Sequence, residues 1–234
     1  MDASLKLAAY INLHRPVIGK VVNFNSGDHV FNIDLTKNNT ELTPGLLADM
    51  QVFNNWVKKK LLETGCRYAV GGYMEQRAIY ESRALFDAET EPRSLHMGID
   101  IWSKAGTPVY APLNGTVHSY RDNNNYGDYG PTIILQHELG DFTLYSLYGH
   151  LSIKSLQGLS VGQTVSINQK IGELGNVDEN GHWPPHLHFQ MMLDMEGRQG
   201  DYPGVCKVSE KEQYLKNIPD PSLLLPFKTA TYRS

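Results

Sequence analysis

The sequence has little of what marks several large classes of protein. It contains only 2 Cys among 234 residues, too few for a disulfide framework, and Cys66 and Cys206 show no metal-like clustering. No run approaches the roughly 20 apolar residues of a membrane-spanning helix. Its 21 Lys and Arg are outnumbered by 25 Asp and Glu, giving a formal net charge of -4, so the basic excess of a nucleic-acid-binding protein is missing. We therefore expect neither nucleic acid nor a membrane as a partner.

An export signal is also not evident, because Asp2 and Lys6 interrupt the short apolar stretch at the N-terminus. Two cysteines in a chain of this length are typical of free thiols in a reducing compartment. These two features predict a cytoplasmic protein. The hydrophobic content of 41%, together with 12 Pro and 21 Gly, predicts a turn-rich globular fold.

Four histidines and one aspartate stand out in what the sequence does contain. His96 and Asp100 lie four residues apart, His150 follows an aromatic run, and His186 and His188 lie two apart in a run typical of a strand. Imidazole and carboxylate are ligands that suit zinc. Because a catalytic zinc takes three protein ligands and leaves one position for water, five such residues could supply three ligands and two assisting groups.

The spacing of these residues constrains their geometry. His186 and His188 share one face of a strand, with backbones roughly 6–7 Å apart, which suits one ligand and one group beside the metal. Spacing alone leaves open which of the two is the ligand. On a straight strand His96 and Asp100 would lie about 13 Å apart, too far to share an ion. We therefore predict a bend between them, with Gly98 supplying a permissive backbone.

At these five positions the chain resembles the lysostaphin-type (LytM-like) zinc metallopeptidase family, whose pattern is His-x-x-x-Asp, a lone histidine and then His-x-His. The likeness extends over about residues 92 to 193. It includes four further segments, at 106–112, 115–117, 161–165 and 170–175. Residues 129–132 and 200–204 also resemble the duplicated hybrid motif peptidases, which are peptidase-like modules of cytoplasmic multi-enzyme chains.

The resemblance implies both a site and a fold. One zinc ion would be bound by His96, Asp100 and His188, with other divalent metals left open, while His150 and His186 would assist catalysis without binding the metal. The implied fold is mainly β, an antiparallel β-sandwich or barrel-sandwich hybrid. We expect this peptidase-like domain at residues 91–206, between an α+β extension at 1–90 and a C-terminal helix and tail at 207–234 that pack on the core.

Local patterns predict several elements of these regions. The extension should hold a hairpin over residues 17–35 and a helix that starts after Thr43 and stops at Gly65. In the central domain, residues 131–137 and 142–148 should form a hairpin. Ser209 with Glu212 has the spacing of a capping box for the short C-terminal helix.

Other residues are weaker candidates for a substrate groove. Loops held by a rigid sheet often carry binding residues, and the loops at 121–130 and 176–184 offer four side chains, Tyr126, Tyr129, His182 and Trp183. Arg77 and Arg83 could bind a substrate carboxylate, although structural pairing with Glu75 or Glu81 is the favoured reading. His137 is expected to have a structural role in a strand.

The predicted function is zinc-dependent hydrolysis of a peptide (amide) bond, with His186 favoured as the base and His150 as its partner. Relatives in the resembled family typically cut peptide cross-bridges of the bacterial cell wall, so a peptide or a peptidoglycan-derived substrate is expected. Two alternatives remain. One is a cytoplasmic hydrolase of a small amide outside the wall, and the other is a non-catalytic module that binds metal or a partner. The oligomeric state stays open.

Overall fold

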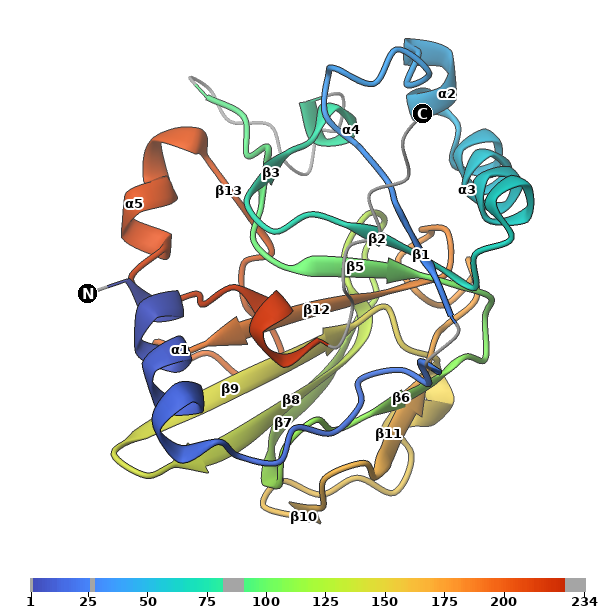
Figure 1. Cartoon of the computed structure of the whole chain (residues 1–234). Coiled ribbons are helices and arrows are strands. Elements are labelled where there is room, and N and C mark those ends of the chain that lie inside the picture. The colour runs from blue at the N-terminus through green and yellow to red at the C-terminus, as the bar shows by residue number, and fades with distance from the viewer. Residues whose placement is uncertain (1, 26–27, 82–90, 226–234) are drawn as a thin grey trace.

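An eight-stranded, mainly antiparallel sheet forms the centre of the protein in the computed structural model, which describes residues 2–25, 28–81 and 91–225 (Figure 1). In spatial order its strands are β1 (Val30–Asn32), β2 (Tyr68–Gly71), β5 (Ile99–Trp102), β12 (His186–Met192), β9 (Phe142–Gly149), β8 (Gly130–Leu139), β7 (Gly115–Asn123) and β10 (Thr164–Val165). The β1–β2 pair is parallel and the other neighbouring pairs are antiparallel. The prediction of a mainly β fold is confirmed.

Two smaller sheets accompany the large one. One pairs β6 (Pro108–Tyr110) with β11 (Lys170–Glu173). The other has β4 (Leu95–His96) between β3 (Glu75–Gln76) and β13 (Val205–Cys206). Because β2 joins the large sheet and β3 joins a small one, residues 68–76 of the predicted extension share sheets with the peptidase-like region.

Strand β12 shows how the large sheet separates core from site. Its seven residues are all buried, and successive side chains point to opposite faces. Leu187, Phe189 and Met191 enter the main hydrophobic core. The alternate residues His186 and His188 therefore lie together on the other face.

Helices lie around the sheets (Figure 1). The α-helices are α1 (Ala3–His14), α2 (Pro44–Ala48), α3 (Met50–Thr64), α4 (Ala78–Glu81) and α5 (Lys211–Tyr214), and the 3-10 helices are η2 (Ile153–Leu156), η3 (Val208–Glu210) and η4 (Pro221–Leu224). Helix α1 was not predicted. Its first turn is capped by Asp2, whose side chain accepts from Ser4 N at 2.8 Å, and Ala3 N donates to Leu215 O just after α5. In the part of the chain that the structure describes, no helix has the length and hydrophobicity needed to cross a membrane.

The helix predicted after Thr43 is confirmed, but in two pieces. The Thr43 side chain caps α2, where Pro44 is the first residue. Asp49 has an extended backbone that ends α2, and its side chain caps α3. Gly65 ends α3 with a φ of 65°, as a glycine stop requires. The apolar side of these helices packs on Trp102 and other residues in a second hydrophobic cluster.

The β8–β9 hairpin is confirmed, whereas two other local predictions are wrong. Within residues 17–25 and 28–35, the part of this range that the structure describes, no hairpin pairing is present: β1 pairs in parallel with β2, and Val22 makes an isolated bridge to Val109. The alternating pattern identified a strand but could not identify its partner. Ser209 does not cap α5, because it lies inside η3 and its hydroxyl donates to Glu91.

Candidate metal centre

The bend predicted between His96 and Asp100 is present, and it is a change of sheet. His96 ends β4 in the three-stranded sheet, and Asp100 lies in β5 of the eight-stranded sheet. The chain turns at Met97 and Gly98, so that His96 Nε2 and Asp100 Oδ1 are 3.3 Å apart. The reason for Gly98 differs from the predicted one. A Cβ there would lie 2.6 Å from His188 Cε1 and 2.9 Å from Phe189 O, so glycine is required for space rather than for an unusual φ.

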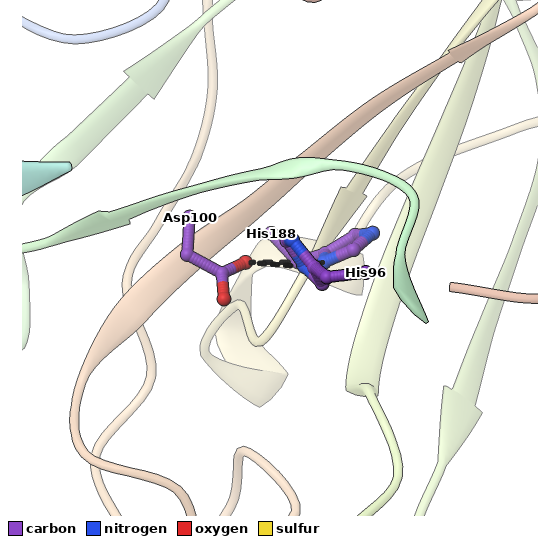
Figure 2. Close-up of side chains that lie close together, drawn as sticks. All are labelled: His96, Asp100 and His188. Atoms are coloured by element: carbon purple, nitrogen blue, oxygen red, sulfur yellow. Dashed lines mark hydrogen bonds and ion pairs between the residues drawn. The ribbon is translucent and has the colours of Figure 1, made fainter. Parts of the chain in front are cut away.

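Three side chains from three strands meet at this point (Figure 2). His188 Nδ1 lies 2.9 Å from His96 Nε2 and 3.1 Å from Asp100 Oδ1. Ligand atoms of a tetrahedral zinc site lie about 2.0–2.2 Å from the ion, hence roughly 3.3–3.6 Å from one another. The three observed separations are within a few tenths of an ångström of that range. The donor set, two imidazoles and one carboxylate, therefore fits a zinc ion.

Hydrogen bonds behind the two imidazoles set their tautomers. His96 Nδ1 lies 3.1 Å from Gly72 O, and a carbonyl oxygen can only accept, so Nδ1 carries the proton. His188 Nε2 lies 3.0 Å from Gln190 Oε1, and Gln190 is oriented by its amide nitrogen, which donates to Pro203 O. His96 Nε2 and His188 Nδ1 thus direct lone pairs at the same point, an arrangement that a shared cation stabilises.

Charge in the cluster also favours a cation. Burial, together with the nearby Arg77 charge, lowers the pKa of His96 to about 3, so the ring is neutral at physiological pH. Burial alone would raise the pKa of Asp100, but His96 and Arg77 outweigh it and hold that pKa well below its usual range. A neutral imidazole and an ionised carboxylate are the protonation states that bind a metal.

His150 and His186 lie side by side next to this cluster, with ring centroids 4.2 Å apart. The Nδ1 of His150 is 2.8 Å from Asn180 O, and the Nδ1 of His186 is 2.7 Å from Pro184 O. Each Nδ1 therefore donates, which leaves each Nε2 as an acceptor. Burial lowers the pKa of both rings, so both are neutral acceptors at physiological pH.

His150 has a strained backbone. Its φ of 61° lies in the left-handed region that non-glycine residues rarely adopt. Backbone hydrogen bonds hold it there, because His150 N donates to Tyr129 O and Gly175 N donates to His150 O. Such strain persists only where the surrounding structure holds the residue in place, and strained residues of this kind are concentrated at functional sites.

Comparison with known proteins identifies the fold around these residues. Residues 94–201 match the sequence profile of peptidase family M23. The chain contains an M23 peptidase domain. It is similar to the peptidoglycan DD-endopeptidase ShyA of Vibrio cholerae, with 26% identity over 203 residues that make up 86% of this chain and 44% of that protein. It is also 35% identical over 99 residues to an uncharacterised metalloprotease of Haemophilus influenzae, covering 42% of this chain and 19% of that one. The chain thus spans less than half the length of these curated relatives.

Solved structures with a similar domain include the catalytic domain of the antimicrobial peptidase lysostaphin from Staphylococcus simulans. Its identity is 28% and its TM-score 0.37, over 53% of this chain and 80% of that one. A zinc-containing peptidase from Vibrio cholerae has 29% identity and a TM-score of 0.34, over 42% of this chain and 27% of that one.

A cleft of about 270 Å³ opens beside the M23 site. Asp100, His150, His186 and His188 line it. Part of its wall comes from residues upstream of the matched profile, namely Leu35, Phe53, Arg77, Ile79 and Tyr80. The N-terminal region therefore helps to shape the cleft of the M23 domain.

Only some of the residues predicted to form a substrate groove line the cleft. Tyr129, Trp183 and Arg77 line the cleft. Tyr126 and His182 stack on each other with centroids 5.3 Å apart and are not among the lining residues, which differs from the prediction. Both residues are exposed, Tyr126 to 62%. Arg83 lies outside the described residues.

Arg77 and His137 have the structural contacts favoured for them. Arg77 Nε donates to Glu75 Oε2 at 2.9 Å, and the same guanidinium also binds Asp100, a contact that sequence reasoning missed. His137 lies between Asn114 O and Ser146 Oγ, away from the metal cluster. Gln190 was also missed, although its position two residues after His188 places it on the same strand face.

Proposed function

We propose that this protein is a zinc-dependent metallopeptidase, in which His96, Asp100 and His188 hold the ion and His150 and His186 move protons. The observation that carries the proposal is that two groups of electron-pair donors lie next to each other. One set converges within the three-residue cluster, and the other belongs to two neutral imidazoles beside it. Hydrolysis of an amide needs an electrophile and a proton acceptor close together.

A bound zinc ion supplies a Lewis acid that polarises a carbonyl and makes water a nucleophile near neutral pH. His186 acts as the base: its Nδ1 is anchored to Pro184 O, so only Nε2 can take the proton of the attacking water. The imidazolium then returns that proton to the leaving amine. His150, anchored in the same way to Asn180 O, also offers only an acceptor Nε2, which holds the attacking water by a hydrogen bond and can share in the transfer of its proton.

For the substrate, we propose peptide bonds in peptidoglycan-derived peptides. The support is similarity to a protein named as a peptidoglycan DD-endopeptidase. The geometry of the cleft favours short substrates within this class. Its volume is about 270 Å³, and the five motif side chains are at most 5% exposed, which suits a small peptide or amide better than a wide polymer. The cytoplasmic location stays a prediction.

A substrate panel tests this preference. We expect soluble muropeptides and short synthetic peptides to be cleaved faster than intact cell-wall sacculi, measured by chromatography of the released products. Faster cleavage of sacculi would contradict the preference for short substrates while supporting the peptidase activity. Binding of these peptides without cleavage by the zinc-loaded protein would instead favour a non-catalytic module.

Metal removal tests the zinc requirement. Treatment with a chelator should abolish cleavage of whichever panel peptide is cut, because the electrophile is lost, and one equivalent of Zn²⁺ should restore it. Metal content measured alongside activity links the two. Full activity of a metal-free sample would contradict the proposal.

A further inference from the structure

Arg77 carries a permanent charge in the interior of the protein. Its side chain is 2% exposed, and it lies between β3 and α4, upstream of the segment that matches the M23 profile. Its backbone N–H donates to Ser94 O at 2.9 Å, which ties this part of the chain to the approach of β4. A charge buried in this way must be paired to be tolerated.

The guanidinium is held from three directions. Nε donates to Glu75 Oε2 at 2.9 Å, and Nη1 contacts the Tyr80 hydroxyl at 3.2 Å. Trp102 lies along it, with its ring centre 5.6 Å from Cζ. Nη1 also donates to Asp100 Oδ2 in a close contact. Arg77 is therefore fixed by its own surroundings before it acts on Asp100.

The two oxygens of Asp100 have different partners. Oδ2 is bound by Arg77, whereas Oδ1 lies 3.1 Å from His188 Nδ1 and 3.3 Å from His96 Nε2, within the three-residue cluster. Because Oδ2 is held toward Arg77, binding of an ion through Oδ1 alone is favoured. Arg77 thus gives the two Asp100 oxygens different roles: Oδ2 is held by an ion pair, and Oδ1 is the oxygen available to a metal.

We propose that Arg77 is a positioning residue that makes Asp100 a one-oxygen metal ligand. This inference rests on the metal site of the proposed function. A carboxylate that used both oxygens would occupy an additional coordination position, and catalytic zinc sites keep that space for water and substrate. Residues 72–77 then orient two of the three proposed ligands, because Gly72 O also orients His96.

The rival explanation is an ion pair that only stabilises the fold. In that case, removing Arg77 would lower the melting temperature but leave the coordination of bound metal unchanged. Coordination therefore separates the two explanations, and Co²⁺ is a suitable probe, since its visible spectrum reports ligand number and geometry.

The experiment compares Arg77→Met with Glu75→Gln in the full chain loaded with Co²⁺. Glu75→Gln is the matched control, because it weakens the outer ion pair and leaves the Arg77–Asp100 contact in place. We expect Arg77→Met to give the weaker visible bands of a higher coordination number, and the zinc form to lose about 10–100-fold in kcat with a smaller change in KM. Glu75→Gln should keep the wild-type spectrum.

A wild-type spectrum for Arg77→Met, or an equal change for Glu75→Gln, would overturn the inference. If Arg77→Met does not fold, Arg77→Lys decides, because lysine has no fork to hold Glu75 and Asp100 together. An altered spectrum for Arg77→Lys would support the inference and an unaltered one would contradict it. The spectra need no substrate, so absence of peptide cleavage by wild type would contradict the proposed function and leave this result standing.

Discussion

Replacing His188 by alanine is expected to remove metal and peptide cleavage together, whereas His186→Ala should retain the metal and lose cleavage. His188 Nδ1 lies 2.9 Å and 3.1 Å from the other two ligand atoms, so its loss leaves only two ligands. His186 contributes no atom to that cluster, and loss of a general base costs about 10²–10⁴-fold in rate. Metal analysis of the purified variants and kcat on a cleaved muropeptide measure both effects.

His182→Asn provides a matched control for this pair. His182 lies in the same stretch of chain, but it is exposed, stacks on Tyr126 and does not line the cleft. Asparagine tolerates its left-handed φ of 67° better than most residues. Metal content and activity should therefore remain close to wild type. Equal metal retention in the His186 and His188 variants would refute the division of roles.

The five proposed site residues could be singled out from sequence because their chemistry is concentrated in short motifs. The alternation of β12 placed His186 and His188 on one face, and the length of a straight strand required the bend before Asp100. The choice of His188 as the ligand came from family resemblance, since spacing alone did not separate it from His186. In the structure His188 Nδ1 lies 3.1 Å from Asp100 Oδ1, within the three-residue cluster, whereas His186 Nε2 lies 3.8 Å from Asp100 Oδ2.

What sequence reasoning missed depends on partners distant in the chain. Arg77 and Asp100 are 23 residues apart, and nothing in either segment specifies the other. The strand at residues 30–32 was detectable, but its parallel pairing with residues 68–70 was not. Helix α1 was hidden because Leu5 and Leu13 are 66% and 78% exposed, so apolar residues occur on both its buried and its solvent-facing sides.

Gly98→Ala should disable the metal site with the addition of one methyl group. The new Cβ would stand 2.6 Å from His188 Cε1 and 2.7 Å from its Nε2, distances that force a shift. The His188 ring cannot retreat easily, since Gln190 lies 3.0 Å from its Nε2. The third nearest atom, Phe189 O at 2.9 Å, belongs to the backbone of β12. We expect weaker zinc binding, by about 10–100-fold as for other disturbances around a ligand, and a corresponding loss of cleavage.

Gly45→Ala is the control that makes this result specific. Gly45 lies in α2, and an added Cβ there meets no atom within 4 Å. Alanine in a helix is favoured over glycine by about 0.5–1 kcal/mol, so this variant should melt at the same or a higher temperature and bind zinc like wild type. Competition with a chromophoric chelator gives the zinc affinity of both variants. A wild-type zinc affinity in Gly98→Ala would show that His188 can move and still bind the ion. Glycine at this position would then be required for folding alone.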